Sequence, residues 1–160
     1  MISIQLICVG KLKEKFYTDA CAEYSKRLNS LCKLSMIEIP EERLPDNPSQ
    51  SQIDTALLRE AEGIEAKLPK NVQIAALCVE GTLLSSEQLA QRLEFWSLGG
   101  ISSLAFLIGG SYGLHPSLKR KASFCLSMSP MTFPHHLARV MVLEQIYRAF
   151  QITKGTRYHK

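Results

Sequence analysis

The sequence lacks the cysteine pattern of a disulfide framework or a zinc site. Its five cysteines are odd in number, widely spaced and form no C-x-x-C pair. Disulfide frameworks and structural zinc sites need paired or closely spaced cysteines, so we expect free thiols in a reducing compartment. The cysteines are Cys8, Cys21, Cys32, Cys78 and Cys125.

The patterns of a signal peptide and a membrane span are also missing. The opening segment MISIQLICVG is apolar, but no positive residue precedes it and no small-residue cleavage site follows, so it predicts a first strand. Residues 97–118 carry no formal charge, yet glycines, serines, His115 and Pro116 dilute their apolarity. We therefore expect a buried strand and a loop there, in a cytoplasmic protein without a membrane partner.

The composition is that of an ordinary soluble protein. The chain has 160 residues, of which 46% are hydrophobic and 21% charged, and its formal net charge is +4. A chain of this length buries roughly two thirds of its unfolded surface, which predicts one domain over residues 1–160. The mild positive charge permits a nucleic-acid partner, although solubility explains it equally well.

Strand and helix patterns alternate along the chain. Apolar, β-rich runs predict strands at residues 2–9, 34–39, 72–79, 103–108 and 123–126. Helical spacing and capping residues predict helices at residues 13–31, 52–68, from Ser85 or Ser86 to Trp96, 116–121 and 134–150. This order predicts an α/β fold with a mostly parallel sheet and helices on both faces.

Three loops should follow the carboxyl ends of strands, where ligands bind in such sheets. One follows Val79, where Glu80-Gly81 is expected to end a strand. Another is the turn Ile108-Gly109-Gly110-Ser111-Tyr112-Gly113, whose glycines let the backbone approach a ligand closely. It matches neither the P-loop nor the G-x-G-x-x-G pattern, and a tight strand-to-helix turn explains it as well.

The third loop, from Ser127 to Pro134, is apolar with a few hydroxyl groups. Its prolines, Pro130 and Pro134, fix φ and stiffen the loop, which can then present main-chain groups to a planar ring. A proline near the first turn is also a simple signal for a helix start. That second explanation accounts for Pro134 but not for the rest of the loop.

The last predicted helix and the tail after it carry titratable groups. His135 and His136 stand at the helix start, where a histidine is commonly a surface or packing residue. Glu144 and Arg148 have the spacing of a helical ion pair. The tail KGTRYHK is basic, and a solvated terminus explains that, although a tyrosine and a histidine beside cations indicate a further role.

The IGGSYG turn, the segment LSMSPMTFPHHLARVMVLEQIYRA and the closing YHK resemble the RlmH family. Members of this family are SPOUT-class methyltransferases that act on pseudouridine in large-subunit ribosomal RNA. The resemblance runs over essentially the whole chain. It implies an α/β sheet with a C-terminal deep trefoil knot, one of the rare exceptions to unknotted topology. It also implies a homodimer that has no separate RNA-binding extension.

The resemblance implies S-adenosyl-L-methionine as the methyl donor, without a metal. Carried over position by position, the donor would lie against the end of a strand, the glycine turn and the proline-containing loop. Main-chain groups would recognise adenine and ribose, with apolar contact from Leu77 and Met131. The implied donor-binding residues are Leu77, Gly109, Gly110, Ser129, Pro130, Met131, Thr132, Phe133 and Pro134.

The implied reaction is methyl transfer to N3 of a pseudouridine in 23S ribosomal RNA, on assembled ribosomes. By resemblance, Arg157 holds a phosphate or the developing imidate, and Tyr158 stacks on or hydrogen-bonds the base. His159 is the expected general base, since the pKa of an unperturbed histidine is near 6.5. The residues expected to orient the RNA are His135, Arg139 and Arg148.

Two other functions stay open. A non-catalytic, ribosome-associated dimer could keep the fold and dock through its basic tail, in which case S-adenosylmethionine would bind weakly or not at all. A nucleotide-binding oxidoreductase could use the same type of crevice. The absence of the G-x-G-x-x-G pattern and of a ribose-binding acid argues against that activity.

Overall fold

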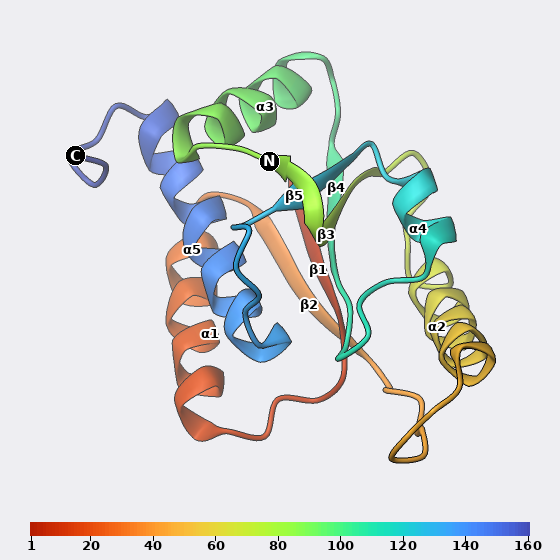
Figure 1. Ribbon diagram of the computed structural model, residues 1–160. Coiled ribbons are helices and arrows are strands. Elements are labelled where there is room, and N and C mark those ends of the chain that lie inside the picture. The colour runs from red at the N-terminus through yellow and green to blue at the C-terminus, as the bar shows by residue number, and fades with distance from the viewer.

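Five parallel strands form the sheet in this computed structural model, which describes residues 1–160 (Figure 1). Their spatial order is β2-β1-β4-β3-β5. The strands are β1 (Ser3–Val9), β2 (Lys33–Ile39), β3 (Gln73–Leu83), β4 (Ser103–Ile108) and β5 (Phe124–Ser127). The helices are α1 (Lys15–Leu28), α2 (Gln50–Glu65), α3 (Ser86–Leu98), α4 (Pro116–Lys121) and α5 (His135–Thr153).

Helices cover both faces of the sheet, as the sequence predicts. Helices α1, α3 and α5 lie on one face, and α2 and α4 lie on the other (Figure 1). Side chains alternate between the faces along each strand. In β1, Ile4 and Leu6 join the core beneath α5, whereas Ile7 and Val9 join the core beneath α2 and α4. None of the helices has the length and apolarity needed to cross a bilayer.

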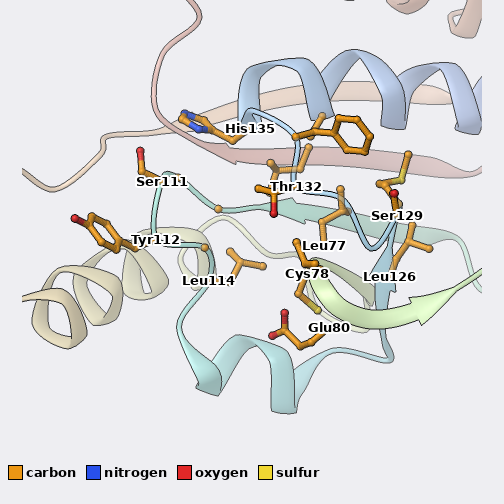
Figure 2. A pocket seen from close by; sticks show the side chains of 18 of the residues that line it. Leu77, Cys78, Glu80, Ser111, Tyr112, Leu114, Leu126, Ser129, Thr132 and His135 are labelled. Atoms are coloured by element: carbon orange, nitrogen blue, oxygen red, sulfur yellow. The ribbon is translucent and has the colours of Figure 1, made fainter. Parts of the chain in front are cut away.

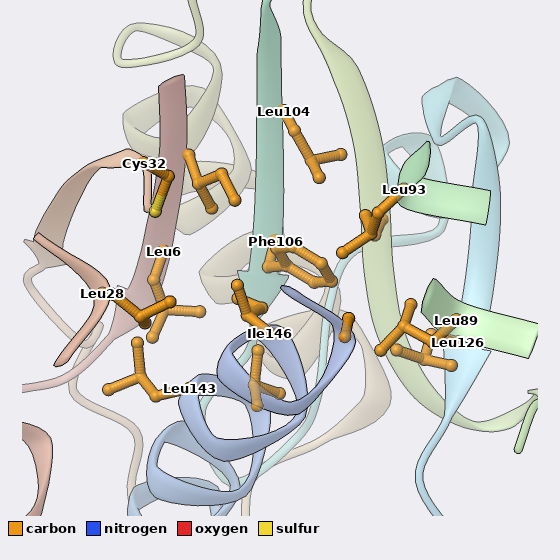
Figure 3. Packing of buried hydrophobic residues seen from close by; sticks show 14 of the residues in the cluster. Leu6, Leu28, Cys32, Leu89, Leu93, Leu104, Phe106, Leu126, Leu143 and Ile146 are labelled. Carbon is orange, nitrogen blue, oxygen red and sulfur yellow. The ribbon is translucent and has the colours of Figure 1, made fainter. Parts of the chain in front are cut away.

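The larger core fixes α5 against the sheet. Phe106 of β4 lies at its centre, with Leu6, Leu143 and Ile146 around it, and all four are fully buried (Figure 3). Burying one such side chain stabilises the fold by about 1.5–3 kcal/mol. Because α5 is held in this way, its first residue, His135, is placed beside the carboxyl ends of the strands.

Capping residues explain where two of the helices begin. The Ser49 side chain accepts a hydrogen bond from the Gln52 amide, and the Gln52 side chain accepts one from the Ser49 amide. This capping box starts α2 two residues before the predicted position. Ser85 and Gln88 form the same arrangement at α3, which settles the choice between Ser85 and Ser86 as the cap. Helix α5 runs to Thr153, beyond the predicted end at Phe150.

The predicted end of the third strand at Glu80-Gly81 is wrong, because β3 continues to Leu83. Leu77 and Thr82 both pair with Leu126 of β5, so the residues between them form a bulge. A Cβ atom on Gly81 would lie 2.7 Å from the Cys125 carbonyl oxygen, so only glycine lets the bulge pass β5 this closely.

The knot expected from the family resemblance stays a prediction.

We expect Phe106→Ala to lower the free energy of unfolding by about 3–5 kcal/mol, because it leaves a cavity under α5. The matched control is Phe95→Ala on α3, since that side chain is 73% exposed. It should cost less than about 1 kcal/mol. Urea unfolding followed by circular dichroism measures both changes. Equal losses in the two variants would contradict this description of the core.

Candidate functional site

A cavity of about 280 Å³ opens at the carboxyl ends of β3, β4 and β5 (Figure 2). Three segments line it: the β3 bulge, the glycine turn after β4 and the loop after β5. They are the three loops that the sequence predicts. Of the implied donor-binding residues, the cavity is lined by Leu77, Gly109, Gly110, Ser129, Met131, Thr132 and Phe133. Pro130 and Pro134 are not among its lining residues.

The glycine turn forms a wall of backbone. A Cβ atom on Gly109 would lie 2.3 Å from the carbonyl carbon and oxygen of Gly113, a separation that no side chain can take. Gly113 has a φ of +78°, a conformation that L residues rarely adopt. Its amide donates to the Gly110 carbonyl oxygen at 3.0 Å, which closes the turn. A flat ligand can therefore lie directly against main-chain groups here.

The loop after β5 is shaped by its serines. The Ser127 hydroxyl lies 2.9 Å from the Val79 carbonyl oxygen, which ties the loop to the β3 bulge. The Ser129 hydroxyl accepts a hydrogen bond from the Met131 amide at 3.0 Å. The exposed prolines, Pro130 and Pro134, thus stiffen the loop from outside the cavity. The expectation that these two prolines touch the ligand is not supported by their positions.

Sequence reasoning missed a charged pair at the cavity. The Nζ atom of Lys119, in α4, is 2.5 Å from Glu80 Oε1. Both residues line the cavity. This hydrogen bond, with a smaller contribution from the charge of Lys119, holds the pKa of Glu80 below its usual range. No sequence signal joins two residues this far apart in the chain. The other lining residues that were not among the predicted site residues are Cys78, Val79, Ile108, Ser111, Tyr112, Gly113, Leu114, Leu126, Met128 and Ala138.

His135 lies at one end of the cavity, near Ser111 (Figure 2). Its Nε2 is buried and has no hydrogen-bond partner. Burial, assisted by the neighbouring His136, lowers the pKa of His135. The imidazole is therefore neutral at pH 7 and has a nitrogen free for a ligand. Its position beside the cavity agrees with the expectation from the sequence, while its role toward RNA stays a prediction.

Arg139 occupies a different place from the one expected. Its side chain is 1% exposed, and Nη1 donates to Glu38 Oε2 at 2.8 Å. Its Nη2 donates to the Gly10 carbonyl oxygen at 2.6 Å. The guanidinium group thus joins α5 to the carboxyl ends of β1 and β2. Because it is closed off from the surface, Arg139 cannot touch RNA, and the expected RNA-orienting role is corrected to one of positioning α5.

The tail is held against α3 and α5. The Tyr158 hydroxyl donates to Glu144 Oε1 at 3.1 Å, and Arg148 Nη2 binds the same oxygen at 2.7 Å. His159 Nε2 lies 2.7 Å from Glu87 Oε1, and its Nδ1 lies 3.3 Å from Arg148 Nη1. The hydrogen bond from His159 lowers the pKa of Glu87 to about 2. We call these five residues the tail cluster.

The tail follows the end of α5 that is opposite His135. Helix α5 has 19 residues and is roughly 28 Å long at about 1.5 Å per residue. His135 is at one end of this helix, and the chain terminus lies beyond the other (Figure 1). Arg157, Tyr158 and His159 do not line the cavity. The structure thus does not bring the predicted catalytic residues to the cavity of the same chain.

Comparison with known proteins agrees with this fold. A parallel α/β sheet with a backbone-walled ligand cavity at its carboxyl edge is the architecture of a ligand-binding α/β enzyme. A family profile described as "Predicted SPOUT methyltransferase" matches residues 2–159. The chain belongs to the SPOUT methyltransferase family.

Its relatives carry more specific names. The chain is 43% identical over 159 residues to "Ribosomal RNA large subunit methyltransferase H" of Leuconostoc mesenteroides, covering 99% of this chain and 100% of the relative. It is 46% identical, with the same coverage, to the protein of that name from Bifidobacterium animalis.

Solved structures resemble the chain at the level of the fold. "Probable Methyltransferase from Bordetella pertussis Tohama I" superposes with a TM-score of 0.58 at 14% identity, covering 93% of this chain and 95% of that one. A "probable methylase family protein" from Haemophilus influenzae superposes with a TM-score of 0.55 at 15% identity, covering 100% of this chain and 72% of that one.

The Glu38–Arg139 pair predicts a dependence of stability on pH. Burial of Glu38 opposes its ionisation, but hydrogen bonds from Arg139 and the Leu12 amide outweigh this and lower its pKa. The ion pair stabilises the fold fully above the pKa of Glu38 in the unfolded chain, about 4.3. This stabilisation is lost as the pH falls through the lower pKa of Glu38 in the folded protein. Glu38→Gln should therefore lower the stability at pH 7 and flatten its decline below about pH 4.3.

Chemical unfolding at a series of pH values measures this effect. The matched control is Glu23→Gln, which removes an exposed helical ion pair with Arg27 at 3.0 Å. This variant should keep the wild-type pH profile. A Glu38→Gln profile that also coincides with the wild type would show that the ion pair adds no stability.

Proposed function

We propose that the protein uses S-adenosylmethionine to methylate N3 of a pseudouridine in 23S ribosomal RNA, on assembled ribosomes in the cytoplasm. Membership of the SPOUT family establishes a methyltransferase. The ribosomal substrate rests on the names of relatives that align with the whole chain. The observation that carries the donor assignment is the cavity, because the three segments assigned to the donor by resemblance line it together.

The residues of this cavity fit an adenosyl group. Leu77, Leu114 and Leu126 offer apolar surface to a planar ring, and the backbone wall at Gly109 admits it without a side chain between. The polar groups at this site, such as the Glu80 carboxylate, suit ribose hydroxyls or an ammonium group. When bound, the donor supplies a methyl group already activated by the positive sulfonium.

Ribosomal RNA is the proposed acceptor, and the tail supplies groups for it. Arg157 is exposed and takes part in no ion pair, so its guanidinium is free to bind a phosphate. Tyr158 offers an aromatic ring, and His159 an imidazole that can take the proton of the pseudouridine N3. Arg148 orients this tail through its contacts with Glu144 and His159.

The site is completed by a second copy of the chain in this proposal. Tyr158 and His159 are bound to Glu144, Arg148 and Glu87, and neither residue lines the cavity of its own chain. Exposed apolar side chains beside the cavity, Val79 at 48% and Met131 at 72%, provide surface that a second copy can cover. A two-fold dimer would deliver each tail to the cavity of the partner.

A transfer assay tests the donor site and the substrate together. Wild-type protein should transfer labelled methyl from S-adenosylmethionine to a single pseudouridine of assembled ribosomes that lack this mark. Gly109→Ala should bind the donor at least tenfold more weakly by calorimetry, because the new methyl group strikes Gly113. Gly99→Ala at the end of α3 is the matched control, since its Cβ would meet no backbone atom closer than 3.3 Å.

Donor binding and methyl transfer, measured together, distinguish the proposed methyltransferase from a non-catalytic dimer and from an enzyme with another substrate. Transfer to pseudouridine by the wild type and the Gly99→Ala control, with loss in Gly109→Ala, supports the proposal. Absence of both donor binding and transfer in folded wild-type protein would favour the non-catalytic dimer. Donor binding with methyl transfer to another nucleotide would retain the enzyme and replace its substrate.

Mixing two inactive variants tests whether the tail acts on the partner's cavity. One variant carries Gly109→Ala, and the other lacks residues 157–160. In an equal mixture that exchanges subunits, each mixed dimer has one intact cavity served by one intact tail. Activity should therefore recover to about a quarter of the wild-type value. A tail that served its own cavity would leave the mixture inactive.

A further inference from the structure

A second cavity adjoins the donor cavity, with His135 between them. It measures about 620 Å³ and lies at the carboxyl ends of β1 and β2. Only one of its ten lining residues is apolar, whereas leucine and methionine side chains line much of the donor cavity. We call it the polar cavity. Its position beside the donor cavity, with a shared histidine, suits the molecule that receives the methyl group.

Glu41, which follows β2, lines the polar cavity and reaches the glycine turn that lines the donor cavity. Its Oε1 is 3.5 Å from Ser111 Oγ in the glycine turn. A Cβ atom on Gly110 would lie 2.9 Å from the same oxygen, so with a larger residue there the carboxylate would have to shift. Glu41 takes part in no ion pair, and its carboxylate keeps free acceptor capacity.

The Glu41 carboxylate and the His135 imidazole converge on one point. A Cβ atom placed on Gly10 would be 3.6 Å from Glu41 Oε2 and 3.6 Å from His135 Nε2. His135 Nε2 has no partner within the chain, and its ring is neutral at pH 7. An unpartnered, buried histidine nitrogen and an exposed carboxylate from distant parts of the chain thus lie near one point. Such groups are retained where a ligand completes their hydrogen bonds.

Three carboxylates and two lysines line the polar cavity. Glu14 is paired with His136 and Glu38 with Arg139, which leaves Glu41 and the two lysines to meet a ligand. The lysines, Lys11 and Lys13, are exposed and form no ion pair within the chain. Cations at the edge of a polar cavity bind the phosphates of a nucleic acid, while groups deeper inside hydrogen-bond the base. A nucleotide turned out of an RNA chain satisfies both requirements.

The carboxylate is suited to one particular base. Pseudouridine is joined to ribose through carbon, so it has an N1–H donor where uridine has a C–H group. A carboxylate can accept from N1–H but gains nothing from C–H. A site built to hydrogen-bond an N–H group strongly rejects the analogue that lacks it, because the site's own polar group stays unpaired.

We propose that the polar cavity receives the target base and that Glu41 accepts the N1–H of pseudouridine. This inference rests on the proposed function and adds the residue that distinguishes pseudouridine from uridine. His135 meets the base on the side of the donor cavity, and Lys11 and Lys13 hold the flanking phosphates. The methyltransferase therefore acts after the reaction that isomerises uridine.

Single-turnover transfer with enzyme in excess tests this inference. Assembled ribosomes lacking the methyl mark are prepared with either pseudouridine or uridine at the target position, the latter from cells without the isomerising enzyme. Glu41→Ala should slow transfer to pseudouridine at least tenfold and change transfer to uridine less than threefold. Glu41→Gln keeps an acceptor oxygen and should retain most of the preference for pseudouridine.

The matched control is Glu42→Ala, which removes an adjacent carboxylate that lies 3.8 Å from Arg59 and lines neither the polar nor the donor cavity. This variant should keep the wild-type preference for pseudouridine over uridine. Calorimetry should show unchanged donor affinity in Glu41→Ala.

Three outcomes would overturn the inference. The first is a Glu41→Ala transfer rate on pseudouridine within threefold of the wild-type rate. The second is an equal fall of the transfer rate on pseudouridine and on uridine. The third is a fall of the transfer rate that weaker donor binding explains. Failure of the wild type itself on pseudouridine would instead reject the proposed function.

Discussion

The buried guanidinium of Arg139 is the interaction on which the arrangement of both cavities depends. It binds the Glu38 carboxylate and the Gly10 carbonyl oxygen, and so connects the start of α5 to the ends of β2 and β1. A buried charge without partners is costly, so this helix can take few other positions relative to the sheet. Arg139 lies one helical turn after His135, and its fixed position places that imidazole between the two cavities.

Backbone forms the wall between the donor and the base to be methylated. Gly109 and Gly113 leave main-chain atoms facing the donor cavity, and Gly110 leaves room for the Glu41 carboxylate on the opposite side. The turn thus separates an apolar cavity suited to an adenosyl group from a polar cavity suited to a base. Direct methyl transfer requires the acceptor nitrogen within about 3.5 Å of the methyl group with no atoms between them, so the two ligands would have to meet beside His135, which lines both cavities.

The tail is the segment that acts across the interface in the proposed dimer. Its tyrosine and histidine are held in place by Glu144 and Glu87, yet neither lines the cavity of its own chain. In the proposed dimer, assembly creates the complete site, and a lone chain would bind the donor without transferring its methyl group. The same arrangement lets a small protein present groups from two chains to one nucleotide of a large RNA.

The sequence by itself determined the order of the elements and the three loops that line the cavity, whereas the tertiary structure decided which polar groups meet. Apolar β-rich runs, helical spacing and serine caps act over a few residues, so they predicted the parallel sheet, both helical layers and the three loops around the cavity. The β3 bulge was missed because its cause is the approach of Gly81 to Cys125 across the sheet. The burial of Arg139, the pairing of Lys119 with Glu80 and the meeting of Glu41 with His135 join residues far apart in the chain. Local patterns carry no information about such pairs, because only packing of the whole chain sets their distances and burial.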